Sequence, residues 1–446
     1  MNLIFHATRL NKFSINALLG ALESLPFFDE LRIELPTDST RLQLLVQLAA
    51  QNAETTLVCF SFFSTQLREV ENLIRQLKLL AGKNTLFLAG GPHPSGDPRG
   101  TLRLGFDLVV CGEGELSLRE VLQRIDDGGD WCSVPGVATL DAGGIYRGPV
   151  RRPPLCLDDF VPYSVRRTRF GPLEITRGCP FACGYCQTPQ LHGARVRHRS
   201  LATVLGHVET LANRGLTDIR FITPNAFSYG SPDGKTVNLP ALRELLAGVR
   251  KVLGGQGRIF FGSFPSEVRP EHVTPETIAL LREFADNDNL VFGAQSGSPR
   301  MLEQCRRAHS LEDVYRAARL TVGAGLKAYI DFILGLPGEE EEDVRQSLAM
   351  MKDLAALGAQ VHAHTFMPLP MTPFAQQPPG RVSPRVKREL ELLIGRGSAF
   401  GDWQKQEQQA EMIAGYLRPA NDSGGPITAS ETQPAGSMMT TNRPEK

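Results

Sequence analysis

Three closely spaced cysteines are the most chemically distinctive residues of the chain. Cys179, Cys183 and Cys186 are separated by three and then by two residues. Thiolates are soft ligands that favour iron-sulfur clusters, zinc or copper. Three thiolates around a 4Fe-4S cluster leave one iron without a protein ligand, and that iron is open to a substrate or cosubstrate. The alternative is structural zinc, which needs a fourth ligand, and His192 and His198 are nearby candidates.

The cysteines directly follow the first of six apolar runs that alternate with helical stretches. Six consecutive strand and helix units predict an incomplete version of the eightfold barrel, a partial (β/α)6 barrel, whose chemistry lies at the carboxyl ends of the strands. The predicted strands are residues 173–176, 218–223, 258–262, 289–293, 327–334 and 360–366.

The N-terminal part of the chain has a similar alternation. Its pattern predicts a doubly wound, Rossmann-like parallel sheet, with strands at residues 3–6, 31–35, 56–62, 85–90 and 106–111. In such a sheet, ligands bind beyond the carboxyl ends of the strands. The candidate binding residues are therefore those that follow the third, fourth and fifth strands: Ser61, Ser64, Gly90, Gly91, His93, Gly112 and Glu113.

The cysteine motif, with Tyr185 just before its third cysteine, resembles that of the radical S-adenosylmethionine superfamily. Segments 292–298 and 306–310 are similar to later segments of this superfamily, and segment 329–339 is similar to members that also carry a cobalamin domain. The strand-end loops of the N-terminal part resemble those of the cobalamin (B12)-binding domain in such proteins. The resemblance implies an enzyme with three cofactors: a 4Fe-4S cluster, S-adenosylmethionine and cobalamin.

The resemblance also implies roles for single residues. The three cysteines would bind the cluster as metal ligands, and the strand-end residues of the N-terminal sheet would contact cobalamin. Tyr185 would pack near the adenine, with ordinary loop packing as its alternative. The remaining contacts to S-adenosylmethionine would come from Glu267, Arg269, Gln295 and Ser296. For Glu267 and Arg269, a surface charge pair is the alternative. Histidine ligation of cobalt is not expected, because the chain lacks an Asp-x-His-x-x-Gly segment.

In this family, cleavage of S-adenosylmethionine generates a radical that abstracts hydrogen. We expect the enzyme to methylate an unactivated carbon of a small-molecule or lipid substrate, with electrons from an external donor such as a flavodoxin or ferredoxin. A radical rearrangement or ring contraction, or a non-catalytic cobalamin or redox sensor, are the alternatives. Cys59, Cys111 and Cys132 raise the alternative of a second cluster, but Cys59 and Cys111 lie within or at the end of apolar strands and are interpreted as buried small hydrophobes. His362 and His364 share one face of a strand, where they suit metal binding, proton transfer or packing.

Composition limits the class of protein. The 446 residues contain 48 Lys plus Arg and 48 Asp plus Glu, so no nucleic-acid partner is expected. No apolar run reaches the roughly 20 residues that span a bilayer, and no secretory signal is evident at the N-terminus, so we expect a cytoplasmic protein. The predicted domains are a cobalamin-binding domain (1–125), a linker with a hairpin at 142–144 (126–165), the barrel (166–375), a helical extension (376–418) and a disordered tail (419–446).

Overall fold

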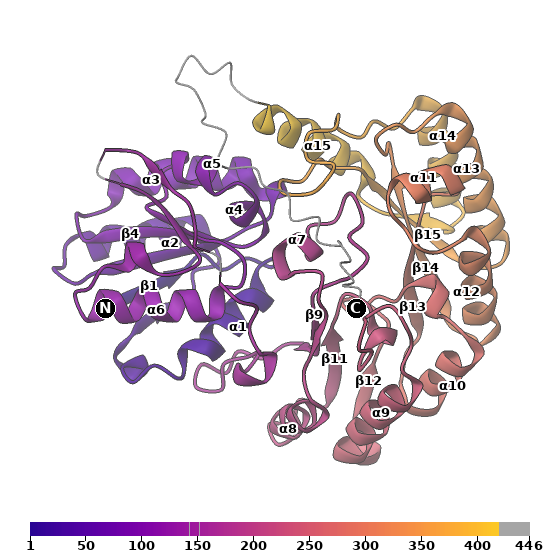
Figure 1. The fold of residues 1–446 in the computed structure, drawn as a ribbon, viewed down its shortest axis with the longest axis horizontal. Coiled ribbons are helices and arrows are strands. Elements are labelled where there is room, and N and C mark those ends of the chain that lie inside the picture. Colours follow the sequence, from indigo (N-terminus) through magenta and orange to yellow (C-terminus); the bar gives the residue numbers. More distant parts are fainter. Residues whose placement is uncertain (142, 151, 419–446) are drawn as a thin grey trace, which may run out of the picture.

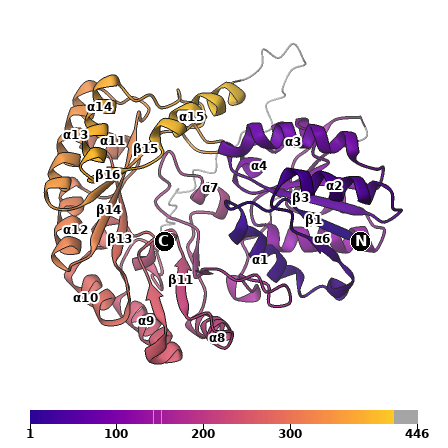
Figure 2. The ribbon, with the colours of Figure 1, turned by 180° about the vertical axis from the view of Figure 1, so that it is seen from behind.

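Two α/β units lie side by side in the computed structural model, which describes residues 1–418 apart from 142 and 151 (Figure 1). The predicted tail, 419–446, and Ala142 in the predicted hairpin lie outside the described residues. The N-terminal unit is a doubly wound sheet, and the C-terminal unit is a curved sheet with helices along its outer side, as Figure 2 also shows from behind. Both fold predictions are confirmed.

The N-terminal sheet has seven strands in the order β2-β1-β3-β4-β5-β6-β7. Its five parallel strands match the five predicted runs: β1 (Asn2–Phe5), β2 (Arg32–Glu34), β3 (Thr56–Ser61), β4 (Thr85–Gly90) and β5 (Leu108–Val110). An antiparallel hairpin, β6 (Val137–Leu140) and β7 (Tyr146–Arg147), extends the sheet beyond β5. Part of the segment predicted as a linker is therefore an edge of this sheet.

Helices cover both faces of the N-terminal sheet because its strands are apolar on both sides. Leu57 and Cys59 of β3 pack in the core on one face, whereas Val58 and Phe60 pack in the core on the other. The first face is covered by α1 (Lys12–Leu22) and α6 (Gly114–Asp126). The second is covered by α2 (Ser39–Ala50), α3 (Leu67–Leu80) and α5 (Pro98–Arg103), while the short α4 (Pro92–Gly96) follows β4.

Two groups of parallel strands form the barrel sheet. The first has the order β12-β11-β8 and the second has the order β13-β14-β15-β16. A hydrogen bond from Val291 N to Gly262 O, 2.9 Å long, and a bridge between Val268 and Phe292 connect them. The strands are β8 (Leu173–Glu174), β11 (Asp218–Ile222), β12 (Arg258–Phe260), β13 (Asn289–Gln295), β14 (Lys327–Leu334), β15 (Gln360–Thr365) and β16 (Ala399–Phe400). Thr176–Arg177 (β9) pairs antiparallel with Arg197–His198 (β10).

The helices of the barrel pack on its outer side. The side chains of every second residue of β14 pack with these helices in the apolar core: Ala328, Ile330 and Phe332. Because successive residues of a strand point to opposite faces, Tyr329 and Asp331 face the lumen of the barrel. The helices are α7 (Thr188–His192), α8 (Leu201–Ala212), α9 (Leu239–Leu253), α10 (Pro275–Phe284), α11 (Pro299–Gln304), α12 (Leu311–Gly323), α13 (Glu341–Ala356), α14 (Pro384–Gly395) and α15 (Trp403–Leu417).

The segment predicted as a helical extension has two structural roles. Its short strand β16 adds a seventh parallel strand beside β15. Its last helix, α15, connects the two units (Figure 1), because Trp403 is buried in the barrel core while Tyr416 packs against the core of the N-terminal sheet. Within the described part of the chain, no helix is long and apolar enough to cross a membrane.

Candidate cofactor site between the two units

The backbone of the cysteine loop is held in place by its neighbours. At the start of the loop, Gly178 has a φ of 90°, and a Cβ there would lie 2.4 Å from the carbonyl oxygen of Arg195. Cys179 N donates to Gly193 O at 3.1 Å, and Cys186 N donates to Cys183 O at 3.0 Å. The loop therefore presents its three thiols from a fixed backbone.

Close packing fixes the middle of the loop. Gly184 N donates to Cys305 O at 3.0 Å, and Phe374 N donates to Gly184 O at 3.0 Å. A Cβ on Gly184 would lie 2.6 Å from the Phe374 ring, so a larger residue would displace either the ring or the loop. Tyr185 is partly buried and packs against an apolar cluster that contains Met301, Cys305, Leu336 and Phe366. Its predicted contact with adenine stays a prediction.

Two arginines lie against the cysteine loop. The Arg307 guanidinium is 3.6 Å from the sulfur of Cys183 and donates to Gly293 O at 3.0 Å. The guanidinium carbon of Arg269 is 3.5 Å from the centroid of the Phe181 ring. Arg269 Nη2 and Arg307 Nε are buried without a hydrogen-bond partner among the described residues. Buried cationic donors of this kind fit the carboxylate of S-adenosylmethionine.

The spacing of the thiols fits a cluster better than a single zinc ion. Thiolates around one zinc lie about 2.3 Å from the metal, which places the sulfur atoms within about 4 Å of one another. In the part of the chain that the structure describes, only Asp331, His362 and His364 form a group of three ligands whose donor atoms all lie within 4.8 Å of one another. The three cysteines are thus too far apart for one ion, whereas a cluster has ligands on separate irons.

The other residues predicted to contact S-adenosylmethionine, Glu267, Gln295 and Ser296, have different surroundings. Glu267 keeps an exposed surface, although the protein that surrounds its carboxyl group, followed by the charge of Asp331, raises the pKa of Glu267 to about 7. Gln295 ends β13 with a φ of 69°, beside a register shift in the strand. Ser296 is buried, and its hydroxyl lies 3.2 Å from that of Ser347 on α13. Its side chain therefore faces the helical layer.

Asn225, in the segment that follows β11, has a supporting position. Its amide nitrogen is 2.8 Å from His272 Nδ1, and its amide oxygen accepts from Arg269 N at 3.3 Å. Both ends of the side chain are occupied, so Asn225 positions the segment that carries Arg269.

The carboxyl edge of the N-terminal sheet holds the predicted cobalamin residues. Gly91 has a φ of 95°, and a Cβ there would lie 2.9 Å from Ser61 Oγ, so only glycine fits beside the end of β3. Gly90 is the last residue of β4. The hydroxyls of Ser61 and Ser14 are 3.2 Å apart and accessible. This edge therefore offers backbone and hydroxyl groups to a ligand.

Ser64 and His93 are paired inside the domain. Ser64 Oγ is 2.9 Å from His93 Nδ1, and the two residues are 1% and 0% exposed. Burial lowers the pKa of His93 to about 4. The His93 ring also stacks with Phe62, with centroids 5.4 Å apart. Neither side chain is at the surface, and their contact with cobalamin stays a prediction.

Glu113 lies in a buried network of ion pairs that joins the two units. Its carboxylate contacts Arg197 and lies 3.3 Å from Arg177. Arg177 also pairs with Glu115 at 2.6 Å and with Glu174 at 2.7 Å. Glu113 and Glu115 come from the N-terminal unit and the arginines from the barrel. The Glu113 carboxylate thus has protein partners on the opposite unit.

Three exposed apolar side chains at the same edge were not predicted from the sequence. Leu10 and Phe13 follow β1, and Phe63 follows β3, with exposures of 56%, 37% and 41%. In the sheet, β1 is the neighbour of β3, and the strand order reverses at this point. In a doubly wound sheet, ligands usually bind in the crevice at the carboxyl ends of the two strands where the order reverses. In the sequence, such positions could be found as apolar residues that follow a predicted strand. In the structure, their exposed side chains fit the edge of a large, partly apolar cofactor.

The two candidate sites face one another. A Cβ on Gly112, after β5, would lie 3.8 Å from the carbonyl oxygen of Leu191 in α7. Gln187, just after the last cysteine, donates to Pro92 O at 3.3 Å and to Pro370 O at 3.0 Å. The carboxyl edge of the first sheet therefore lies against the cysteine loop and the helix that follows it.

Comparison with known families decides the assignment. Residues 173–351 match the radical SAM superfamily, and residues 14–122 match the B12 binding domain. The chain therefore contains a B12 binding domain followed by a radical SAM domain. It is a radical SAM enzyme, and its cofactors are a 4Fe-4S cluster, S-adenosylmethionine and cobalamin.

Relatives of this radical SAM enzyme occur in archaea. An uncharacterized protein of Methanopyrus kandleri is 25% identical over 414 residues, which cover 77% of this chain and 73% of that protein. An uncharacterized methyltransferase of Pyrococcus horikoshii is 26% identical over 285 residues, covering 61% of this chain and 59% of that protein. The chain thus spans less than two thirds of the length of the second relative.

Solved structures share the fold of this radical SAM enzyme. The radical S-adenosylmethionine methyltransferase TsrM from Kitasatospora setae, with cobalamin and a [4Fe-4S] cluster bound, has a TM-score of 0.64 at 21% identity, covering 84% of this chain and 76% of that one. The cobalamin-dependent radical enzyme OxsB, with aqua-cobalamin bound, has a TM-score of 0.60 at 17% identity, covering 78% and 51%. Both support the order of a cobalamin domain followed by a radical SAM barrel.

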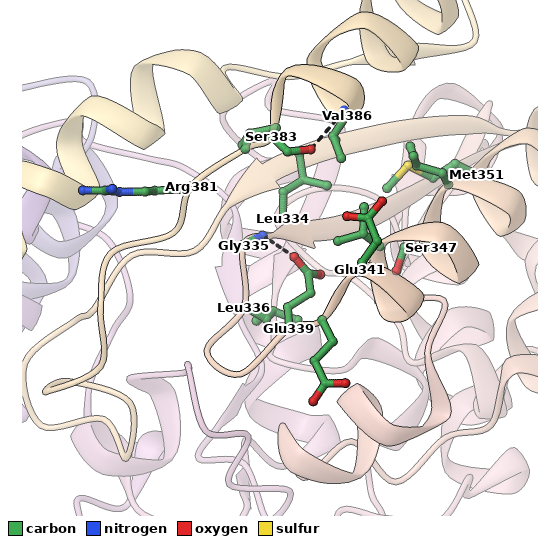
Figure 3. Close-up of a pocket in the computed structure, with 14 residues that line it drawn as sticks. Leu334, Gly335, Leu336, Glu339, Glu341, Ser347, Met351, Arg381, Ser383 and Val386 are labelled. Atoms are coloured by element: carbon green, nitrogen blue, oxygen red, sulfur yellow. Dashed lines mark hydrogen bonds between the residues drawn. The ribbon is translucent and has the colours of Figure 1, made fainter.

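A separate cavity lies outside this site, between the end of β14 and helices α13 and α14 (Figure 3). Glu339 lines it and accepts a hydrogen bond from Gly335 N at 3.0 Å. Burial raises the pKa of Glu339 to about 7. None of the cofactor residues predicted from the sequence lines this cavity.

Proposed function

We propose that this enzyme transfers a methyl group, carried by cobalamin, to an unactivated carbon of a small-molecule or lipid substrate. The observation that supports the proposal is the close approach of the two candidate sites. Gly112 lies near the carbonyl oxygen of Leu191, and Gln187 donates a hydrogen bond to the carbonyl oxygen of Pro92. Reacting atoms must come within about 3 to 3.5 Å of one another. Cofactors on these two edges would share one space with a substrate.

The protein's own residues would hold and orient the reactants. Cys179, Cys183 and Cys186 bind the cluster, while Arg269 and Arg307 offer cationic donors beside it. When bound, the cofactors supply the radical and the methyl transfer, and the barrel supplies orientation and exclusion of water. In this proposal, residues 1–125 carry the cobalamin site and residues 166–375 carry the cluster site.

Two further findings support methyl transfer. A relative from Pyrococcus horikoshii carries the description of an uncharacterized methyltransferase, and TsrM is described as a methyltransferase. The proposal includes an external electron donor, such as a flavodoxin or ferredoxin, and a location in the cytoplasm. The first is needed because cleavage of S-adenosylmethionine consumes one electron.

Product analysis tests the proposal. Anaerobically reconstituted enzyme would be incubated with a reductant, cobalamin, S-adenosylmethionine labelled in its methyl group, and an extract of small molecules and lipids. Methyl transfer predicts labelled product together with S-adenosylhomocysteine. Product without label, and without S-adenosylhomocysteine, would instead support rearrangement. Absence of any turnover would support a sensor and contradict the proposal.

A further inference from the structure

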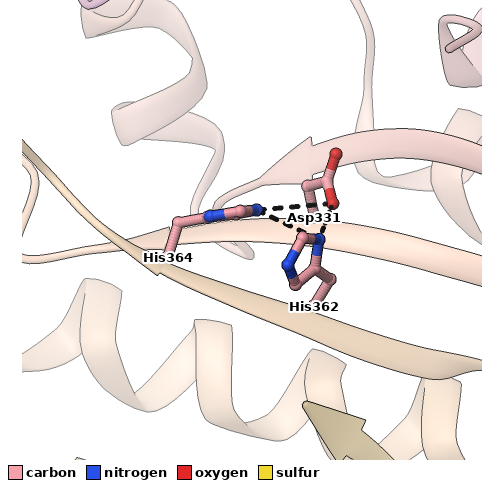
Figure 4. Close-up of side chains that lie close together, drawn as sticks. All are labelled: Asp331, His362 and His364. Atoms are coloured by element: carbon pink, nitrogen blue, oxygen red, sulfur yellow. Dashed lines mark hydrogen bonds and ion pairs between the residues drawn. The ribbon is translucent and has the colours of Figure 1, made fainter. Parts of the chain in front are cut away.

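Three side chains converge in the barrel on the face of the sheet opposite the helices (Figure 4). Asp331 is on β14, and His362 and His364 are on the neighbouring strand β15. His362 Nδ1 lies 2.9 Å from Asp331 Oδ1, and His364 Nε2 lies 3.2 Å from His362 Nδ1 and 3.6 Å from Asp331 Oδ1. Two imidazole nitrogens and one carboxylate oxygen thus point at a common position.

The strands place these groups without help from a flexible loop. Asp331 and His362 are direct partners in the parallel register of β14 and β15, and the period of a strand puts His364 on the same side as His362. The ring of Phe400, on β16, stacks on His362 with centroids 4.4 Å apart and planes 10° from parallel. The positions of the ligands are therefore set by the sheet itself.

The spacing of the three donor atoms suits a first-row metal ion. A point equidistant from them lies about 1.9 Å from each, so an ion about 2.1 Å from all three, as zinc requires, would sit about 0.9 Å above their plane. The site therefore combines a preformed geometry with two imidazole ligands and one carboxylate ligand.

We propose that Asp331, His362 and His364 form a binding site for one divalent transition-metal ion, with zinc as the first example. The two histidine side chains are 30% and 29% exposed, so the ion would keep coordination positions open to the lumen. Those positions would take an oxygen or nitrogen atom of the substrate, a step that rests on the proposed function. Metal binding itself does not depend on it.

Gln406 contacts His364, one of the proposed ligands, and should therefore affect the affinity of the site for a metal ion. Its amide oxygen accepts from Thr365 N at 2.8 Å, so its amide nitrogen faces His364 Nδ1, at 3.2 Å. A ring nitrogen that faces an N–H group acts as an acceptor, and His364 therefore carries its proton on Nε2. If a metal ion binds at Nε2, the proton must lie on Nδ1 instead. The Nδ1–H group then needs an oxygen atom as its hydrogen-bond acceptor. Replacement of Gln406 by glutamate would supply that oxygen.

Zinc binding to the full-length, cluster-containing protein tests the proposal without any substrate. The protein would be dialysed anaerobically against Zn²⁺ buffered by a chelator, and bound zinc measured by elemental mass spectrometry. We expect one zinc per chain, at least about tenfold weaker binding in His362→Ala and in His364→Ala, and about tenfold tighter binding in Gln406→Glu, since groups that bond to ligands typically alter affinity by about 10 to 100-fold.

Two controls separate this site from others. His207→Gln removes a histidine that bonds to Tyr163, at 3.1 Å, and zinc binding should not change. A variant with serine at all three cluster cysteines should still bind one zinc at the site. Absence of zinc binding, or binding that His362→Ala and His364→Ala leave intact, would overturn the proposal. The proposal also predicts tighter zinc binding by Gln406→Glu. It can therefore still be contradicted if one of the alanine variants folds poorly.

Failure of methyl transfer would leave these zinc measurements untouched. Conversely, an enzyme that methylates its substrate but binds no zinc would retain the proposed function and lose the metal site.

Discussion

Arg269 lies over the ring of Phe181, with its guanidinium carbon 3.5 Å from the ring centroid. Phe181 is within the cysteine motif, between Cys179 and Cys183, whereas Arg269 follows the third strand of the barrel. The contact joins two candidate cofactor segments that are far apart in the sequence. It also turns a buried, unpartnered Arg269 Nη2 toward the surroundings of the cluster.

Replacement of Arg269 by lysine should weaken binding of S-adenosylmethionine to the cluster-containing protein by about tenfold. Lysine keeps the charge but loses the planar group that stacks and donates in a fork. Equilibrium dialysis under anaerobic conditions would measure the affinity. Arg220→Lys is the matched control, because Arg220 stacks on Phe260 at 3.8 Å, away from the cysteine loop. Equal affinities in both variants would contradict the role of Arg269.

Cys179, Cys183 and Cys186 should together bind about four irons and four sulfides per chain. Replacement of all three by alanine should reduce both to background in anaerobically prepared protein, as measured by chemical analysis and visible absorption. Replacement of the buried Cys59 is the control. Cys59 and Cys111 pack on opposite faces of the N-terminal sheet, so they do not share a second cluster, and iron content should not change. A triple variant that retained its iron would refute the assignment.

Phe63→Ser should weaken hydroxocobalamin binding by about fivefold. Its side chain is 41% exposed at the crevice edge, and covering that apolar surface contributes about 1 kcal/mol. Equilibrium dialysis with hydroxocobalamin measures the affinity. Leu392→Ser, at a 56% exposed position on α14, provides a control with the same change of polarity. If both variants bind cobalamin as the wild type does, Phe63 lies outside the site.

Glu113→Gln should destabilise the protein by about 3 kcal/mol, because removal of one partner leaves buried charges uncompensated. The Glu113 side chain is 9% exposed, and its partner Arg197 is 14% exposed. Chemical denaturation would show the loss, together with faster proteolysis between the two units. Asp218→Asn breaks an ion pair with Arg258 whose side chains are 50% and 61% exposed. Because solvent screens exposed ion pairs, that control should leave the free energy of unfolding nearly unchanged.

The same carboxylate predicts a dependence on pH. Burial would raise the pKa of Glu113, but the nearby His192, the hydrogen bonds from Arg197 and the charge of Arg177 outweigh it and lower the pKa. A lowered folded-state pKa contributes stability that is fully present above the ordinary value of about 4.3 and is lost as the pH falls toward the folded value. The stability difference between wild type and Glu113→Gln should be constant between about pH 6 and 8 and shrink below about pH 4. A difference that grows in acid would contradict this sign.

The sequence by itself determined the features that depend on neighbouring residues. The five parallel strands of the N-terminal sheet and the six main strands of the barrel follow from runs of apolar residues. The cysteine motif could be recognised because its three ligands lie on one short loop, and the family followed from it. Gly91 could be singled out as a glycine that follows a predicted strand, whereas its left-handed backbone and its close contact with Ser61 are seen only in the tertiary structure.

Only the tertiary structure decided where side chains from distant segments meet. Ser64 and His93 follow different strands, and their burial against each other depends on packing that no local pattern encodes. The partners of Glu113 come from the opposite unit, so the strand-end position alone suggested a ligand contact. The group of Asp331, His362 and His364 required the register of β14 against β15, because a shift of one residue would turn Asp331 away from both histidines.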